Sequence, residues 1–431
     1  MNPKQKLSAR QLIQEARSFE KSGSFGKAVD KYKEVLSNFP QNKKAASRIL
    51  EINSKQNISH NENNEIRMFE DALRRGDKAS VRAIAKAMVF HKTCNSFVLF
   101  HYAKVIDEAE VDTLLGIIGS EINQPNISKY DKINLLMARY FSEKKKKLFH
   151  QAFDTLTFAN SLQYSKNTFQ PSKDEQSVKI LKSLFSDIDV RKERLKNGSS
   201  EKDLIFIVGM PRSGTTLLEQ VLCRHNQISS IGEKPFATKF LSIENWQNHK
   251  DLNKILRNLK SFYQSNLKKE KVSTDFVIDK MPFNLFWVGF LALAFPRAKF
   301  FYTRRDARAT CWSNYETPFA EGNSYSFRLE DIVDHYNRCT LLMRFWIDLF
   351  PNQIFTFDYE KFVSRPMKYG PQLFDFLGLE WSNSFLEVNK SKTNVMTASQ
   401  LQVKEKIYSG SSEQWKNFSL RIGTEFSSLI Q

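Results

Sequence analysis

The residues from Leu204 to Leu218 form the stretch of this chain best suited to chemistry. Five apolar residues, Leu204–Val208, are typical of a buried parallel strand, and the sequence Gly209-Met-Pro-Arg-Ser-Gly-Thr-Thr216 is typical of a tight loop. Apolar residues at helical spacing follow the loop. A strand, a glycine-bounded loop and a helix N-terminus together present successive backbone N–H groups to a phosphate. The sequence therefore predicts a site for a phosphate-bearing ligand.

The loop departs from the sequence of a loop that binds nucleotide triphosphates. Gly209 and Gly214 have the required spacing, but Thr215 stands where that motif needs lysine, and Arg212 lies inside the loop. No aspartate suited to Mg²⁺ is obvious on a second strand. A nucleotide kinase or another triphosphate-loop enzyme is thus the alternative interpretation, and the sequence argues against cleavage of a γ-phosphate.

Further reactive side chains follow other strand ends. Glu233 comes after a turn glycine beyond the helix that leaves the loop, and Lys280 lies just beyond the carboxyl end of the strand Phe276–Ile278. Arg305 follows the strand Lys299–Thr303, and Ser313 lies two helical turns later. Arginine binds phosphate through two parallel hydrogen bonds, so this turn is a second candidate anion site.

These elements alternate in a way that predicts an α/β fold. Four short apolar strands, Leu204–Val208, Phe276–Ile278, Lys299–Thr303 and Ile354–Phe357, are separated by helical segments. Such alternation is typical of a parallel sheet flanked by helices, whose ligands bind at the carboxyl ends of the strands.

The first part of the chain has a different, all-helical pattern. The spacing of six residues matches one 34-residue tetratricopeptide unit: Leu12, Ala16, Phe19, Ala28, Tyr32 and Pro40. Residues 64–118 predict two or three amphipathic helices, and residues 131–162 resemble a degenerate repeat. We predict a tetratricopeptide-like helical domain at 1–170, a connecting helix and linker at 171–202, and an α/β domain at 203–431.

Composition sets broader limits. The 431 residues carry a net charge of +18, which suits polyanionic ligands, and the Lys144–Lys147 run is interpreted as an exposed face. Four cysteines without a C-x-x-C pair argue against a structural zinc or a disulfide framework. The N-terminus has no apolar core, and the apolar run Leu285–Phe295 is too short to span a bilayer. The default expectation is a cytoplasmic protein.

Taken together, the motifs resemble the sulfotransferase family that uses 3′-phosphoadenosine-5′-phosphosulfate, abbreviated PAPS. The resemblance is strongest to the tyrosylprotein sulfotransferase branch and covers residues 203 to about 420. It rests on four motifs: Pro211-Arg-Ser-Gly-Thr-Thr216, Gly232-Glu233, Lys-x-Pro-Phe at 280–283 and Arg-Asp-x-Arg-Ala at 305–309. Helical repeats ahead of such a domain resemble a bacterial arrangement.

The resemblance implies a role for each matching residue. The 5′-phosphosulfate would be held by Arg212, Ser213, Gly214, Thr215 and Thr216, and the 3′-phosphate by Arg305 and Ser313. Glu233 would be the general base, and Lys280, with Arg212, would stabilise charge on the transferred group. Tyr359 and Ser399 match donor-contacting residues, and no metal is implied. His225 is a competing base, because other branches use histidine, but we interpret it as structural.

One departure weakens the transfer of a substrate. Where the tyrosylprotein branch has a second arginine, this chain has Thr317. The acceptor hydroxyl could therefore belong to a protein or peptide tyrosine, a carbohydrate or a small molecule. We expect no nucleic-acid partner, and we expect the helical region to govern acceptor choice or homo-oligomer assembly rather than donor chemistry. A helical-repeat adaptor carrying an inactive sulfotransferase domain is the remaining alternative.

Overall fold

The computed structural model describes residues 8–39, 42–165, 169–190, 192–193, 202–244, 246–248, 251–319, 322–387 and 410–430. The chain forms two compact units. Unit 1 contains residues 1–71 and 86–93, and unit 2 contains residues 72–85 and 94–431. The long helix α3, Lys43–Arg74, and helix α4, Lys78–His91, contribute to both units.

Unit 1 begins with a helical hairpin. Helix α1 is Ala9–Lys21 and helix α2 is Phe25–Asn38, joined by three residues. Ser8 caps α1 through a reciprocal hydrogen-bond pair with Gln11, which satisfies two backbone donors at the helix start. Four of the motif residues are buried in the small core of the hairpin: Leu12, Ala16, Ala28 and Tyr32. The hairpin fits the predicted repeat, but Pro40 lies outside the described residues, and the tetratricopeptide assignment stays a prediction.

Unit 2 opens with further helices. They are α5 (Ser96–Val105), α6 (Val111–Ile122), α7 (Lys129–Lys145) and α8 (Phe149–Tyr164). The apolar periodicity of the segment that resembles a degenerate repeat places six residues on the inner faces of α7 and α8, and all are buried: Leu136, Ala138, Tyr140, Ala152, Leu156 and Ala159. The helical periodicity in this part of the sequence therefore predicted its packing correctly.

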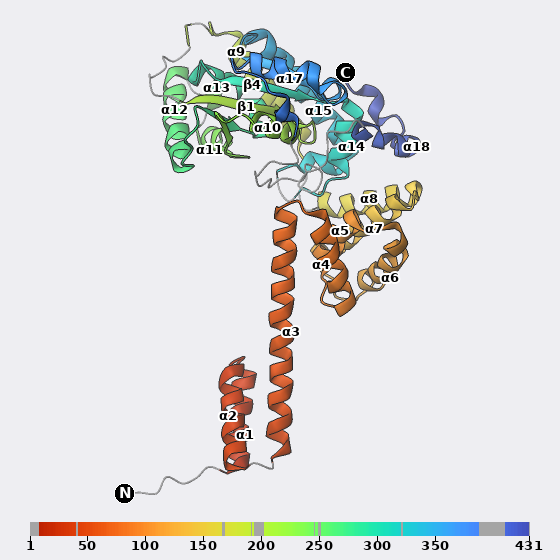
Figure 1. Cartoon of the computed structure of the whole chain (residues 1–431). Helices are drawn as coiled ribbons and strands as arrows, with labels where there is room; N and C mark the ends of the chain where they lie inside the picture. The colour runs from red at the N-terminus through yellow and green to blue at the C-terminus, as the bar shows by residue number, and fades with distance from the viewer. Residues whose placement is uncertain are drawn as a thin grey trace, which may run out of the picture. The chain divides into compact units, whose positions relative to one another are not determined.

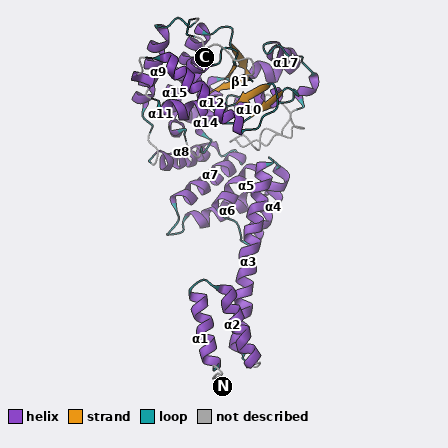
Figure 2. Cartoon of the chain, turned by 90° about the vertical axis from the view of Figure 1, so that its left-hand side faces the viewer, coloured by secondary structure: helices purple, strands orange, loops and turns teal. Residues whose placement is uncertain are grey.

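A five-stranded parallel sheet follows (Figure 1). The strands are β1 (Asp203–Gly209), β2 (Ile228–Ser230), β3 (Phe276–Asp279), β4 (Lys299–Arg304) and β5 (Ile354–Asp358), in the order β2-β3-β1-β4-β5. Helices surround the strands (Figure 2). The four predicted strands are confirmed. The three-residue strand β2 was not predicted, because so short a segment has no alternation to detect.

Alternate residues of β1 face two different helical layers. Ile205 and Ile207 pack on one side against α10 (Thr215–Leu222), α16 (Tyr359–Ser364) and α17 (Pro366–Asp375). Phe206, on the other side, stacks on Phe300 at 5.0 Å between ring centroids and meets Tyr263 of α12 (Leu252–Lys269). The sheet is thus covered on both faces, as its continuous apolar strands require.

The apolar run at 285–295, too short to span a bilayer, forms a buried helix whose first turn is tighter. A 3₁₀ segment, Pro282–Trp287, precedes helix α13, Val288–Ala294. Helix α9 (Pro171–Ser186), the predicted connecting helix, packs against α15 (Leu329–Leu349) and places Phe185 edge-on to Trp346, with ring centroids 4.9 Å apart. No helix among the described residues is both long enough and apolar enough to cross a membrane.

The helices before the sheet also contact the α/β domain directly. Asn160 of α8 donates a hydrogen bond of 2.9 Å to the carbonyl of Tyr315, at the end of helix α14, Ala307–Tyr315. Phe153 of α8 stacks near Trp312 of α14, and Trp312 also stacks on Phe418 at 4.3 Å. Residues 94–165 and the sheet therefore belong to one compact unit. The domain boundaries at 170 and 202 are placed where the sequence pattern changes, and they stay a prediction.

Candidate active site

The loop after β1 approaches two neighbouring residues too closely for side chains at its two glycines. Gly209 has a φ of 146°, and a Cβ there would lie 2.6 Å from Thr303 Oγ1. Gly214, the N-cap of α10, has a φ of 101°, and a Cβ there would lie 2.6 Å from the Tyr359 ring. Between them Arg212 takes a left-handed conformation, with a φ of 68°. The loop is therefore compact, and glycine is needed at both ends.

This compact loop joins the end of β1 to the N-terminus of α10, which therefore lies at the edge of the sheet where the strands end. Gly214 makes no side-chain cap, so the first N–H groups of α10 carry the partial positive charge of a helix N-terminus. Ser213 is buried, and its hydroxyl donates 2.6 Å to the Met210 carbonyl and lies 2.5 Å from Thr303 Oγ1. Ser213 thus holds the loop to β4, while the backbone of the loop and helix is suited to an anion.

Arg212 lines two cavities at this edge. One is small, about 30 Å³, and is also lined by Arg305, Ser313, Glu316 and Trp415. The other is larger, about 430 Å³, and is also lined by Glu233, Thr215 and Thr216. Because the same side chain borders both, an elongated ligand held at the loop could reach from one cavity into the other.

The small cavity contains two arginines and a serine, the groups expected for a phosphate. Arg212 Nε donates to Ser313 Oγ at 3.0 Å, and Arg305 Nη1 donates to the Arg212 carbonyl at 3.0 Å. Arg305 is held further by Ser411 and Ser412, which accept hydrogen bonds of 2.6 Å and 3.1 Å. The predicted pair Arg305 and Ser313 therefore lies together with the loop arginine.

Tyr359 joins the loop to the segment near the C-terminus. Its ring lies against Gly214 and under the Arg305 guanidinium, 5.2 Å from ring centroid to Cζ. Its hydroxyl lies 2.9 Å from Ser411 Oγ. This places Tyr359 beside the predicted donor residues. Ser399, the other residue expected to contact a donor, lies outside the described residues.

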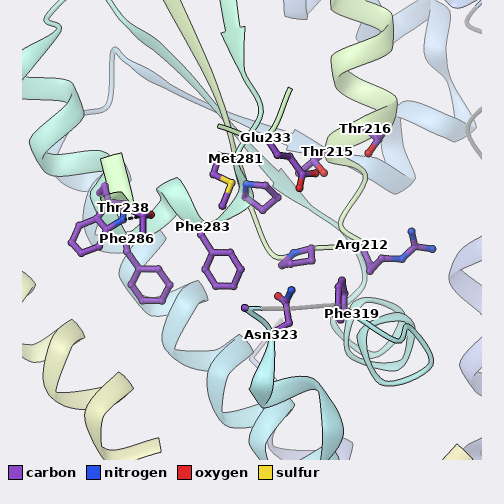
Figure 3. A pocket seen from close by; sticks show the side chains of 14 residues that line it. Arg212, Thr215, Thr216, Glu233, Thr238, Met281, Phe283, Phe286, Phe319 and Asn323 are labelled. Carbon is purple, nitrogen blue, oxygen red and sulfur yellow. Dashed lines mark hydrogen bonds between the residues drawn. The ribbon is translucent and has the colours of Figure 1, made fainter. Parts of the chain in front are cut away.

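Four aromatic residues, Phe283, Phe286, Trp287 and Phe319, are among the residues that line the large cavity (Figure 3). In the view of Figure 3, Phe286 and Arg212 lie on opposite sides, and Phe283, Glu233 and Thr215 lie between them. The cavity is completed by Pro211, Thr238, Met281, Pro282, Trp287, Phe319, Gly322 and Asn323. One carboxylate therefore faces a space whose walls are otherwise apolar or uncharged, apart from Arg212.

Glu233 belongs to a small charge cluster. Its carboxylate contacts the ammonium of Lys280, which lies 3.7 Å from Glu219 on α10. Lys280 is 1% exposed, whereas the Glu233 side chain is 41% exposed. Burial raises the pKa of Glu219, while Lys280 and the Ser230 hydroxyl act in the opposite direction. Lys280 is thus a buried cation between two carboxylates, of which only Glu233 reaches the cavity.

The residue before Lys280 is also unusual. Asp279 is fully buried, and its Oδ2 accepts a hydrogen bond of 2.6 Å from the Tyr263 hydroxyl, while Oδ1 has no partner among the described residues. Burial raises the pKa of Asp279 to about 7, against the lowering effect of the hydrogen bonds from Tyr263 and Asn284 and the charge of Lys280.

The structure gathers most of the predicted site residues and corrects one interpretation. The loop, Glu233, Lys280, Arg305, Ser313 and Tyr359 all lie at the carboxyl edge of the sheet. His225 lines neither cavity; its ring packs on Phe374 and Phe385. Lys144 was expected on an exposed face, but it is 18% exposed and pairs with Glu316. This pairing crosses 172 residues of sequence, so local charge patterning could not reveal it.

Sequence reasoning missed Glu219, Asp279 and Glu316. Glu219 follows the loop motif by three residues and looks like an ordinary polar position of a helix. The described residues contain no cluster of three or more metal-ligating side chains.

Comparison with known proteins assigns the α/β domain to a family. Residues 203–383 match the sulfotransferase family, and this part of the chain is a sulfotransferase-family domain. An uncharacterised protein of Aquifex aeolicus is 28% identical over 342 residues, which cover 75% of this chain and 45% of that protein. Protein-tyrosine sulfotransferase 1 of Danio rerio is 26% identical over 229 residues, covering 49% of this chain and 64% of the relative.

The matched region thus spans less than half of the Aquifex protein and just under two thirds of the Danio protein. Among solved structures, the sulfotransferase domain from the curacin biosynthetic pathway is similar over 53% of this chain and 99% of that domain. Its sequence identity is 19% and its TM-score 0.39.

Proposed function

We propose that this protein transfers a sulfuryl group from PAPS to the hydroxyl of an acceptor that carries an apolar, aromatic group. The observation that supports this most is the position of Arg212. It borders a small cavity with Arg305 and Ser313 and a larger, aromatic cavity with Glu233. The small cavity would hold the 3′-phosphate of the donor. The large cavity would hold the acceptor next to its base, Glu233.

The loop residues would hold the 5′-phosphosulfate of the donor. Arg212, the backbone of Gly214 and the first turn of α10 at Thr215 and Thr216 offer N–H donors and positive charge without a metal ion. Arg305 and Ser313 would hold the 3′-phosphate, with Trp415 in the same cavity. The residues present therefore fit a donor with two separate anionic groups.

The transfer itself needs a base and positive charge. Glu233 would accept the proton of the acceptor hydroxyl as that oxygen bonds to sulfur and the bond from sulfur to the 5′-phosphate oxygen breaks. Arg212 would stabilise the charge that builds up on the leaving phosphate. Lys280 contacts Glu233 and is buried, so direct contact between its ammonium and the sulfuryl group stays a prediction.

The walls of the large cavity support the choice of acceptor class. Phe283, Phe286 and Trp287 offer flat apolar surfaces, which suit an aromatic ring better than a polyhydroxylated sugar. A phenolic hydroxyl, whether on a tyrosine side chain or a small molecule, would bring its oxygen to Glu233 in the cavity wall.

Calorimetry of the full chain with 3′-phosphoadenosine-5′-phosphate tests the donor assignment. We expect binding in the presence of a chelator and no preference for ATP. Loss of binding on adding the chelator, or tighter binding of ATP, would support the triphosphate-loop alternative instead.

The acceptor class is tested separately with ³⁵S-labelled PAPS, a tyrosine peptide, a simple phenol and a hydroxylated carbohydrate. We expect label on the phenolic acceptors. Transfer to the carbohydrate alone would contradict the aromatic acceptor without contradicting the donor. Donor binding without transfer to any acceptor would favour an adaptor with an inactive domain.

A further inference from the structure

The small cavity contains a negative charge that an anion site should avoid. Glu316 follows the last residue of α14 and lines this cavity together with Arg212, Arg305 and Ser313. Its side chain is 12% exposed. A carboxylate at this depth repels a phosphate unless another group compensates its charge.

The compensating groups come from helix α7, more than 170 residues earlier in the chain. Lys144 Nζ lies 2.6 Å from Glu316 Oε2, and the Tyr140 hydroxyl donates to the same oxygen at 2.7 Å. Lys144 also donates 3.1 Å to Oε1 of Gln414, another residue of the cavity wall. Helix α7 and both sides of the cavity belong to unit 2.

The protonation of Glu316 agrees with this geometry. Burial alone would raise its pKa, but Lys144, Tyr140 and Arg212 outweigh burial, and the pKa lies below its ordinary value. The carboxylate is therefore ionised at neutral pH, and its charge is matched by that of Lys144. The charge of Lys104 also acts on Glu316 and Arg212. Without Lys144, the carboxylate would depend on Lys104 and Arg212, and the phosphate would compete with it for Arg212.

We propose that Lys144 is a positioning residue for the donor, which sets the affinity of the small cavity for the 3′-phosphate by neutralising Glu316. This inference rests on the proposed function. It makes the helical region part of the donor site, whereas the sequence alone indicated a role in acceptor choice or assembly.

A charge cycle in the full chain tests the inference. The ligand is 3′-phosphoadenosine-5′-phosphate, and adenosine 5′-monophosphate, which lacks the 3′-phosphate, is the control ligand. Calorimetry at pH 8 with chelator compares the wild type with Lys144→Met, Glu316→Gln and the double variant. Lys147→Met is the matched control, because Lys147 belongs to the same lysine run and is exposed.

The expected affinities follow the net charge of the pair. Lys144→Met leaves one extra negative charge and should weaken binding of the bisphosphate about tenfold or more, the usual consequence of an uncompensated buried charge. Glu316→Gln leaves one extra positive charge and should strengthen binding. The double variant should return to within about threefold of the wild type. Binding of the monophosphate, and all binding by Lys147→Met, should change less than about twofold.

Different outcomes overturn different conclusions. If the wild type does not bind the bisphosphate, the proposed donor is wrong. If the wild type binds it and Lys144→Met binds equally well, the role of Lys144 is wrong while the donor stands. Equal weakening for both ligands, or no recovery in the double variant, would show that Lys144 only supports the fold. If Lys144→Met does not fold, Glu316→Gln alone decides, since weaker binding by that variant contradicts the inference.

Discussion

Replacing Glu233 with Gln removes one negative charge and keeps the length of the side chain. The carboxylate contacts Lys280, but this lysine also lies 3.7 Å from Glu219, so it keeps a partner in the variant. The Glu233 side chain is 41% exposed but Lys280 is 1% exposed, so the pair is half-buried and its loss costs more than that of a surface pair. We therefore expect the free energy of unfolding to fall by about 1–2 kcal/mol.

The expected effect on transfer is much larger. Loss of a general base lowers turnover by about 10²–10⁴-fold. This range corresponds to about 2.7–5.4 kcal/mol in the activation barrier, at 1.36 kcal/mol for each factor of ten. A residue with a purely structural role would lower the stability without lowering the turnover of the folded enzyme by this factor.

The assay has two parts. Calorimetry with 3′-phosphoadenosine-5′-phosphate should show an affinity within about threefold of the wild type, because Glu233 lines only the large cavity. Transfer of ³⁵S label to a phenol should fall by the range above. Urea unfolding provides the stability value.

His225→Ala is the matched comparison. His225 lies outside both cavities, and its Nδ1 accepts a hydrogen bond of 3.2 Å from the Gln227 backbone. Its removal should cost some stability and leave turnover nearly unchanged. The reasoning is refuted if His225→Ala abolishes turnover while Glu233→Gln has a mild effect.

Three further predictions concern the donor site, the buried aspartate and the helical region. Arg305→Ala should weaken binding of the bisphosphate by about 1.5–3 kcal/mol in calorimetry, the contribution of a charge-assisted contact, and an unchanged affinity would remove Arg305 from the site. The folded protein keeps the Asp279 proton up to about pH 7, whereas an unfolded chain loses it near pH 4. The stability that this group contributes is therefore complete below pH 4 and is lost as the pH rises toward 7. Asp279→Asn avoids that loss. In urea titrations, the free energy of unfolding of this variant minus that of the wild type should increase by about 3 kcal/mol from pH 4.5 to pH 7.5. The same dependence of the unfolding free energy on pH in both proteins would contradict this prediction. Deletion of residues 1–71 should leave the affinity for the bisphosphate within about twofold of the wild type. Deletion of residues 1–165 also removes Lys144 and uncovers Trp312, so it should lower this affinity about tenfold or more. Equal affinities of the two deletion variants would show that the helices are dispensable for donor binding.

The sequence predicted the parts of the fold that depend on local pattern. The strand at 204–208 is a continuous apolar run, and the strand at 299–303 has three aromatic residues, Phe300–Tyr302, at its centre; such runs are typical of parallel strands covered on both faces. The phosphate loop could be predicted because glycine at 209 and 214 reflects backbone geometry and close neighbours rather than distant contacts.

Other parts of the site depend on long-range contacts that local pattern does not encode. Glu219 joins the charge cluster of Lys280 and Glu233 only because β2 and β3 bring Ser230 and Lys280 to α10. Lys144 lies in a run of four lysines, and nothing local distinguishes the one that meets Glu316. The same holds for Phe418, whose stacking on Trp312 brings the end of the chain onto α14.

The hydrogen bonds from Arg305 to the Ser411 carbonyl and the Ser412 hydroxyl affect the entropy of ligand binding. A guanidinium has five N–H donors, and three of those of Arg305 are engaged by the Arg212 carbonyl, Ser411 and Ser412. Its long side chain is therefore already ordered before any ligand arrives. Immobilising such a side chain on binding typically costs about 0.5–1.5 kcal/mol. Here that cost falls on folding instead. Ser412→Ala removes the hydroxyl that accepts from Arg305 Nε, so it should make ligand binding less favourable in entropy even though it removes no cation.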